Sequence, residues 1–96
     1  MLEADYGSQF KRDYKRCRQK HLEIADLHTV INLILENSEE SLEELRRHHN
    51  MPSLQGKWKG RNECHVANAG DWLVIWSTSN TIAFFERTGT HNELFR

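Results

Sequence analysis

Residues 72–87 read Trp-Leu-Val-Ile-Trp-Ser-Thr-Ser-Asn-Thr-Ile-Ala-Phe-Phe-Glu-Arg, and this stretch decides the fold. Two runs rich in β-branched and aromatic residues predict strands over 72–77 and 81–87. The intervening Thr-Ser-Asn at 78–80 is short enough for the turn of an antiparallel hairpin. A third strand is predicted over 57–66, and a short turn joins it to the hairpin. The second half of the chain is therefore expected to form a three-stranded antiparallel meander.

Helices are predicted in the first half of the chain, over about residues 9–20, 24–36 and 41–47. The first helix has an apolar stripe at positions i, i+4 and i+7, and Ser8 is its expected N-cap. The second helix has a wide apolar face that a sheet or another helix must cover. Residues 1–6 are a candidate for one more short strand, and residues 91–95 for a helical turn.

Together these elements predict a single domain over residues 1–96 with an α+β fold. Two to three amino-terminal helices are expected to pack on one face of a small antiparallel sheet. The aromatic residues of the last two strands are expected to belong mainly to the core; they are Trp72, Trp76, Phe84 and Phe85.

Charge is distributed in blocks, although the formal net charge is only −1. Residues 1–20 carry six Lys or Arg and three acids, residues 21–45 carry seven acids and no Lys or Arg, and residues 46–96 carry seven Lys or Arg and four acids. The near-neutral total argues against a strongly basic nucleic-acid binder, whereas a basic block can still steer a polyanion. The cations of the first helix are interpreted as a solvated face, with an RNA-facing ridge as the alternative.

Cysteine usage and hydropathy indicate the compartment. Cys17 and Cys64 are too few for a disulfide framework and have no Cys-x-x-Cys spacing, so a reduced, cytoplasmic setting is expected. No signal-peptide pattern opens the chain, and the longest apolar run is far shorter than a membrane span. Strand alternation places Cys64 and His65 on opposite faces, and no metal-ligand spacing is present, so neither a metal nor another cofactor is expected.

Three residues at strand ends suit acid–base chemistry. His65 lies near the end of the first predicted strand, Asp71 begins the second, and His91 follows the third. The turn between the first two strands should bring His65 and Asp71 close, and a carboxylate with two imidazoles can transfer protons at neutral pH. The alternative is structural, since strand histidines are often only hydrogen-bonded and Asp71 can cap its turn.

Cations and aromatic rings accompany these residues. The cations that can bind a phosphate and its developing charge are Lys57, Lys59, Arg61 and Arg87. The rings that can stack on bases are Trp58, Trp72 and Phe95.

Four segments of the second half resemble a known family. They read Leu-Gln-Gly-Lys-Trp-Lys-Gly at 54–60, Glu-Cys-His at 63–65, Asp-Trp-Leu-Val-Ile-Trp at 71–76 and Glu-Arg-Thr-Gly-Thr-His-Asn-Glu-Leu-Phe at 86–95. In this order they resemble the YafQ branch of the RelE/ParE toxin superfamily, and the helical half agrees with that family in pattern. The resemblance implies a small twisted antiparallel sheet with two amino-terminal helices.

The resemblance also implies a type II toxin that acts as an mRNA endoribonuclease on the translating ribosome. Such an mRNA interferase cuts a codon in the ribosomal A site by attack of the RNA's own 2′-hydroxyl, without a metal or cofactor. The matched positions are His65, Asp71, His91 and Phe95. Proton transfer falls to His91 and Asp71, proton transfer or phosphate contact to His65, and positioning of a base to Phe95.

Further residues are assigned around this set. Arg87 is a candidate, on physical grounds, for stabilising transition-state charge. Trp72 lies at a matched position and is expected to help hold the site. The residues expected to contact RNA are Lys57, Lys59, Arg61, Trp72 and His49.

One position departs from the family pattern. Family members usually carry a histidine two residues before the Leu of Leu-x-Gly, and Pro52 stands there. Proline can neither exchange protons nor donate a hydrogen bond, so activity is expected to fall unless His48 or His49 substitutes from a shifted loop. Two alternatives therefore stay open: a non-nucleolytic ParE-like toxin that inhibits DNA gyrase by contact, and a catalytically attenuated toxin that only binds its antitoxin.

Partners follow from the same resemblance. They are a cognate antitoxin, the 70S ribosome with its mRNA, and operator DNA bound through the toxin–antitoxin complex. A helix or strand of the antitoxin is expected to cover the basic face of the toxin.

Overall fold

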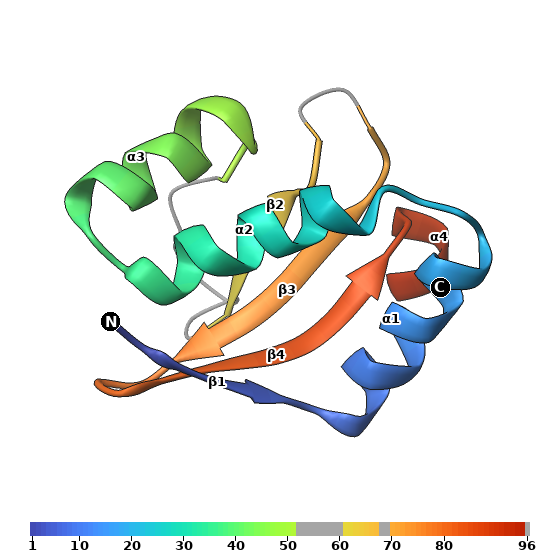
Figure 1. Cartoon of the computed structure of the whole chain (residues 1–96), viewed down its shortest axis with the longest axis horizontal. Coiled ribbons are helices and arrows are strands. Elements are labelled where there is room, and N and C mark those ends of the chain that lie inside the picture. The colour runs from blue at the N-terminus through green and yellow to red at the C-terminus, as the bar shows by residue number, and fades with distance from the viewer. Residues whose placement is uncertain (52–60, 68–69, 96) are drawn as a thin grey trace.

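The structure, a computed structural model, describes residues 1–51, 61–67 and 70–95. Its elements run in the order β1 (Glu3–Tyr6), α1 (Ser8–Gln19), α2 (Ile24–Glu36), α3 (Glu39–His48), β2 (Asn62–His65), β3 (Leu73–Thr78), β4 (Ile82–Gly89) and α4 (His91–Leu94), as Figure 1 shows. One four-stranded sheet has the strand order β1-β4-β3-β2. α1 and α2 supply apolar side chains to the core on one side of this sheet, and α3 lies against α2, far from α4 (Figure 1).

The predicted α+β class is confirmed, but the sheet is mixed rather than wholly antiparallel. β2, β3 and β4 form the predicted antiparallel meander. β1 pairs in parallel with β4 over Tyr6↔Phe85 and the three pairs before it. Short connections set the direction of the meander strands, whereas three helices separate β1 from β2, so no local turn sets the direction of β1.

The strand bounds differ from the prediction mainly in β4. The strand was predicted to end at Arg87, but it continues through Gly89, whose φ of 154° lies outside the range of most L-residues. A Cβ atom on Gly89 would lie 2.8 Å from Glu93 Oε1 and 3.1 Å from Arg16 Nη2. Glycine is therefore required here both for its backbone angle and for space. The predicted strand over 57–66 is described only as β2, since residues 52–60 lie outside the described residues.

The helix bounds confirm the predicted α2 and correct its neighbours. α2 ends at Glu36, and Asn37 terminates it in the left-handed conformation with φ of 53°. Gly7, rather than Ser8, is the N-cap of α1, and no side chain caps this helix. α3 begins at Glu39, earlier than predicted, because Ser38 accepts a hydrogen bond from the backbone N–H of Ser41 and thereby caps it.

Aromatic rings from β1, α1 and β4 join in the core between sheet and helices. The Tyr6 and Phe85 ring centroids are 5.2 Å apart, and Phe10 lies 5.5 Å from Phe85. The predicted core positions Trp76 and Phe85 are buried. Phe84 is wrong as a core prediction: it is 37 % exposed, because strand alternation turns it toward the opposite face.

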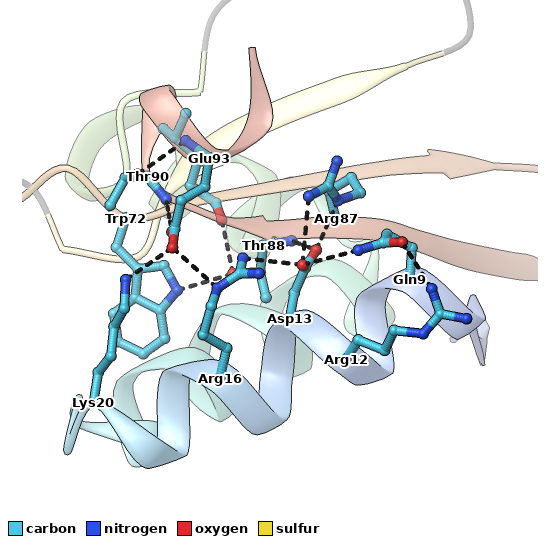
Figure 2. Close-up of polar contacts among 11 residues, drawn as sticks. Gln9, Arg12, Asp13, Arg16, Lys20, Trp72, Arg87, Thr88, Thr90 and Glu93 are labelled. Atoms are coloured by element: carbon cyan, nitrogen blue, oxygen red, sulfur yellow. Dashed lines mark hydrogen bonds and ion pairs between the residues drawn. The ribbon is translucent and has the colours of Figure 1, made fainter. Parts of the chain in front are cut away.

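A buried carboxylate joins α1 to the end of β4. Asp13 is fully buried, and its Oδ2 accepts hydrogen bonds from Arg87 Nε at 2.7 Å and from the backbone N–H of Thr88 at 3.2 Å (Figure 2). Its Oδ1 accepts one from Arg16 Nη2 at 3.0 Å. β1 pairs only with the first half of β4, so the N–H of Thr88 has no strand partner on that side. Asp13 therefore takes the place of a strand at this edge, because a buried N–H needs an acceptor.

Replacing this carboxylate should destabilise the whole fold. Asp13→Asn removes the charge that compensates two partly exposed arginines, and we expect a loss of about 2–3 kcal/mol in the free energy of unfolding. Urea unfolding followed by circular dichroism measures this change. Asp5→Asn, which alters an exposed carboxylate of β1, is the control and should change stability by less than about 0.5 kcal/mol. Equal stability of the two variants would contradict the proposed role of Asp13.

Candidate active site

The register of the meander brings Asp71 and His91 together. Leu73 of β3 lies opposite Gly89 of β4. Two residues further out, Asp71 precedes β3 and His91 begins α4, so the same antiparallel register sets them opposite each other. The contact is direct: Asp71 Oδ1 accepts hydrogen bonds from the backbone N–H of His91 at 3.1 Å and from its ring Nδ1 at 2.5 Å.

His65 and Phe95 complete a group around the His91 ring. His65 pairs with Leu73, so the end of β2 lies beside the start of β3. The His65 ring centroid is 5.9 Å from that of His91, and the Phe95 centroid is 6.1 Å from it. Phe95 follows His91 by four residues, which places both on one side of the α4 turn. The four residues predicted for the site therefore lie together.

The Asp71–His91 pair is open to solvent, and its hydrogen bonds lower the pKa of Asp71. The side chains of His91 and Asp71 are 55 % and 59 % exposed, so a large substrate can reach them. Hydrogen bonds from the ring and then the backbone of His91 hold the pKa of Asp71 below its ordinary value. A carboxylate can only accept, so Nδ1 of His91 carries the proton, and Nε2 is the nitrogen left for chemistry.

His49, at the end of α3, binds the backbone of His65 through hydrogen bonds. The backbone N–H of His65 donates to the carbonyl of His49 at 2.7 Å. The His49 ring Nδ1 lies 3.0 Å from the carbonyl oxygens of both His65 and Val66, and it must donate because carbonyls only accept. This nitrogen of His49 is therefore engaged with the backbone, and an RNA contact by His49 stays a prediction. His48 pairs with Glu44 at 2.8 Å instead.

Asn50 is a site residue that sequence reasoning missed. Its Nδ2 lies 3.3 Å from Nδ1 of His65, and its backbone adopts a left-handed φ of 51°. When this amide donates, Nδ1 of His65 is the acceptor, and the proton of the neutral ring sits on Nε2. No motif marks Asn50 in the sequence; only the approach of α3 to β2 does.

Two further predicted residues are held by internal contacts. Trp72 is half-buried, and its indole N–H donates to Thr88 Oγ1 at 2.9 Å (Figure 2). Thr88 Oγ1 donates in turn to the carbonyl of Leu73 at 2.8 Å. These two hydrogen bonds connect Trp72, the residue beside Asp71, to β4. Arg87 is bound to buried Asp13, so its described contact is structural, and stabilisation of transition-state charge by Arg87 stays a prediction.

The predicted RNA-binding cations are only partly covered by the description. Arg61 is exposed and pairs with Glu86 at 3.1 Å. Lys57 and Lys59 lie outside the described residues, as does Pro52, the position that departs from the family pattern. Within the described ranges, no group of three or more His, Cys, Asp or Glu is placed to hold a metal ion. No described helix is long and apolar enough to cross a membrane.

Comparison with known proteins identifies the family. The model of the family described as "Bacterial toxin of type II toxin-antitoxin system, YafQ" matches residues 2–96. The chain belongs to the YafQ toxin family. This membership confirms the resemblance drawn from the four sequence segments. The matched residues also include the helical half, which carries no such motif.

Relatives and solved structures of the YafQ family extend this match. The chain is similar to the mRNA interferase toxin YafQ of Escherichia coli strain K12, with 32 % identity over 93 residues, which is 97 % of this chain and 95 % of the relative. It is also similar to a chain of the E. coli DinJ–YafQ toxin–antitoxin complex, with a TM-score of 0.81, 30 % identity and coverage of 99 % and 98 %. A metal-bound toxin from Helicobacter pylori has a TM-score of 0.81 with 24 % identity and coverage of 99 % and 100 %, and this likeness shows the fold alone.

The Asp71–His91 contact predicts a measurable titration. Because the folded state binds the Asp71 proton weakly, the contact should stabilise the fold above the ordinary aspartate pKa and be lost as pH falls through the lowered pKa. His91→Ala should raise the pKa of Asp71 toward its ordinary value, as followed by carbon-detected NMR of the carboxyl group. His48→Ala is the control and should leave that pKa unchanged. An Asp71 pKa that ignores the loss of His91 would contradict the contact.

A second prediction concerns the proton on His65. Asn50→Ala should remove the donor to Nδ1 and let the neutral ring populate both tautomers, as read from its nitrogen chemical shifts. Asn32→Ala, on an exposed position of α2, is the control. Identical nitrogen shifts of His65 in wild type and Asn50→Ala would show that Asn50 does not set the tautomer.

Proposed function

We propose that this chain is a ribosome-dependent mRNA endoribonuclease, a type II toxin that cuts mRNA in the ribosomal A site without a metal cofactor. The observation that carries the proposal is the solvent-open Asp71–His91 pair, with the His65 and Phe95 ring centroids 5.9 Å and 6.1 Å from that of His91. Two imidazoles and a carboxylate within this small group can supply both proton transfers of a phosphodiester cleavage.

Similarity over nearly the whole chain supports the same activity. The E. coli relative named an mRNA interferase toxin aligns with 97 % of this chain. Fold likeness alone would be weak evidence, because one fold hosts many functions. Here the four residues matched by sequence segments also come together in space. The proposal therefore rests on a site and not only on a fold.

The proposed reaction needs a base and an acid on either side of one phosphate. The 2′-hydroxyl loses its proton to the base and forms a bond to phosphorus, while the bond from phosphorus to the 5′-oxygen breaks and the acid protonates that oxygen. The products are a 2′,3′-cyclic phosphate and a 5′-hydroxyl. We assign His91 Nε2 as the base, because Asp71 keeps the proton on Nδ1. We assign His65 Nε2 as a donor to the phosphate, because Asn50 faces the other ring nitrogen and the neutral ring then carries its proton on Nε2. His65 acts as the acid when its ring is doubly protonated and Asn50 presents its amide oxygen to the N–H of Nδ1.

Binding of the RNA involves rings and cations around these groups. The Phe95 ring is 47 % exposed beside His91, so a base can stack on it and be oriented toward His91. Lys57, Lys59 and Arg61 are proposed to contact phosphates near the site, together with His49 and the exposed part of Trp72. Arg87 is proposed to add positive potential near the site while it remains paired with Asp13.

Neutralisation by a partner protein completes the proposal. A relative of this chain was solved in the DinJ–YafQ toxin–antitoxin complex. We propose that a cognate antitoxin binds this chain in the cytoplasm, blocks its entry into the 70S ribosome, and carries the complex to operator DNA. Antitoxin bound over the basic face would also cover the exposed site residues.

Cleavage by purified protein added to translating ribosomes is the decisive test. Mapping of RNA 5′ ends should reveal cuts within codons that require ribosomes and are missing from naked RNA. His91→Ala should lower the cleavage rate at least about a hundredfold, because general acid–base catalysis contributes that much or more. His28→Ala removes another exposed histidine, one that lies on α2 beside Tyr14 and has no assigned role in the site, and should cleave like wild type.

Three outcomes would argue against parts of the proposal. Full cleavage by folded His91→Ala would remove the assigned base. Cuts in naked RNA at the same rate would remove the dependence on the ribosome. No cleavage by folded wild-type protein would favour an attenuated or gyrase-binding toxin, and Pro52→His would then separate the two, since only an attenuated nuclease should regain cleavage.

A further inference from the structure

The catalytic turn α4 is too short to hold itself in place. It has four residues, whereas isolated helices need about 12–15 residues to be even marginally stable in water. Its first residue is His91, and Phe95 directly follows its end. Both are exposed, so core packing does little to position them. Some other contact must keep the two rings in register with Asp71.

Glu93 makes that contact in two directions. Within the turn, its Oε1 accepts a hydrogen bond from the backbone N–H of Thr90 at 2.9 Å, while Thr90 Oγ1 accepts one from the N–H of Glu93. Across to α1, its Oε2 lies 2.8 Å from Lys20 Nζ and 3.0 Å from Arg16 Nε (Figure 2). The first contact closes a capping box, and the second fastens that box to a three-turn helix.

The two cations contribute differently. Lys20 donates an aligned hydrogen bond to Glu93. Arg16 Nε is buried and has no aligned acceptor among the described residues, so its contact with Glu93 is charge pairing. The other end of the Arg16 guanidinium binds Asp13 at 3.0 Å. Arg16 thereby links the carboxylate that caps α4 with the carboxylate that closes the edge of β4.

The surroundings of Glu93 are built for a carboxylate. The hydrogen bond from Lys20 and that from the N–H of Thr90 hold its pKa near 2, so it stays ionised at physiological pH. Gly89 lies directly against Oε1, where a Cβ atom would come within 2.8 Å. Residues two apart on a helix do not face each other, so Glu93 turns toward α1 while His91 turns toward Asp71.

We propose that Glu93 is a positioning residue for the active site: through Lys20 and Arg16 it tethers the turn that carries His91 and Phe95 to α1. Glu93 does not touch the reacting atoms. The contact between Lys20 and Glu93 is exposed, and exposed ion pairs add little to global stability, so this contact acts on the placement of the two rings more than on unfolding. Small displacements of catalytic groups lower rates strongly, which gives the tether its effect. Its catalytic consequence rests on the proposed nuclease function.

Glu93→Gln tests the tether with little other change. Glutamine can still accept from the N–H of Thr90 and keep the capping box, but it loses the charge that pairs with α1. We expect the rate at saturating ribosomes to fall about tenfold, with the melting temperature lowered by less than about 4 °C. Lys20→Ala should lower the rate in the same direction by a smaller factor, and it provides the test if Glu93→Gln fails to fold.

Glu43→Gln is the matched control. Glu43 also pairs with two cations, Arg46 at 3.2 Å and Arg47 at 3.6 Å, but it lies on α3 (Figure 1). This variant should cleave like wild type. Unchanged cleavage by both Glu93→Gln and Lys20→Ala, or an equal loss in Glu43→Gln, would overturn the proposal.

A readout that needs no cleavage separates this proposal from the proposed function. Backbone nitrogen relaxation should show larger nanosecond motion for residues 91–95 in Glu93→Gln and Lys20→Ala than in wild type or Glu43→Gln. If the wild type proves inactive, this comparison still decides whether the tether exists. Residues 91–95 that are as rigid in both tether variants as in wild type would overturn it.

Discussion

The end of the sheet that carries the candidate active site depends on the hydrogen bonds and ion pairs made by the Asp13 carboxylate. β4 has a strand partner on both sides only while it pairs with β1, and its last residues would otherwise leave a buried N–H without an acceptor. Asp13 accepts that N–H from Thr88 and holds the guanidinium groups of Arg87 and Arg16. Burying a carboxylate without such donors would lower the stability of the folded state, so Asp13 can be buried only because these groups donate to it.

The candidate active site lies at the ends of β2, β3 and β4, next to the part of β4 that Asp13 holds. Asp71 and His91 meet because the β3–β4 register continues past both strands, and His65 comes from the adjoining end of β2. A hydrogen bond from a different element holds each group. Trp72, beside Asp71, donates to Thr88, and the His49 ring at the end of α3 binds the carbonyl of His65. The turn that begins with His91 is capped by Glu93. The side chains of Asp71, His91 and Phe95 stay exposed to solvent, while the residues that hold them lie in the sheet and helices.

Sequence patterns predicted most elements but missed the polar contacts between them. Two of these residues did carry local signals: Asp13 follows Phe10 by three residues on the buried stripe of α1, and Thr90-x-x-Glu93 is a capping-box signature. Asn50 carried none. The predicted end of this strand at Arg87 was wrong, since β4 continues through Gly89, and this glycine leaves room for the Glu93 carboxylate beside the strand.

The sequence by itself determined the helices, the meander, the α+β class and the family, since periodicity, turn residues and motif segments act over short distances along the chain. It also singled out His65, Asp71, His91 and Phe95 through those segments. Only the tertiary structure decided that β1 runs parallel to β4, that Arg87 is paired with Asp13, and that Glu93 reaches α1. These contacts join residues that are more than 70 positions apart in the sequence; Asp13 and Arg87, for example, are 74 positions apart. No local propensity specifies such a pair; it forms because the folded core sets one buried carboxylate against the part of β4 that β1 does not reach.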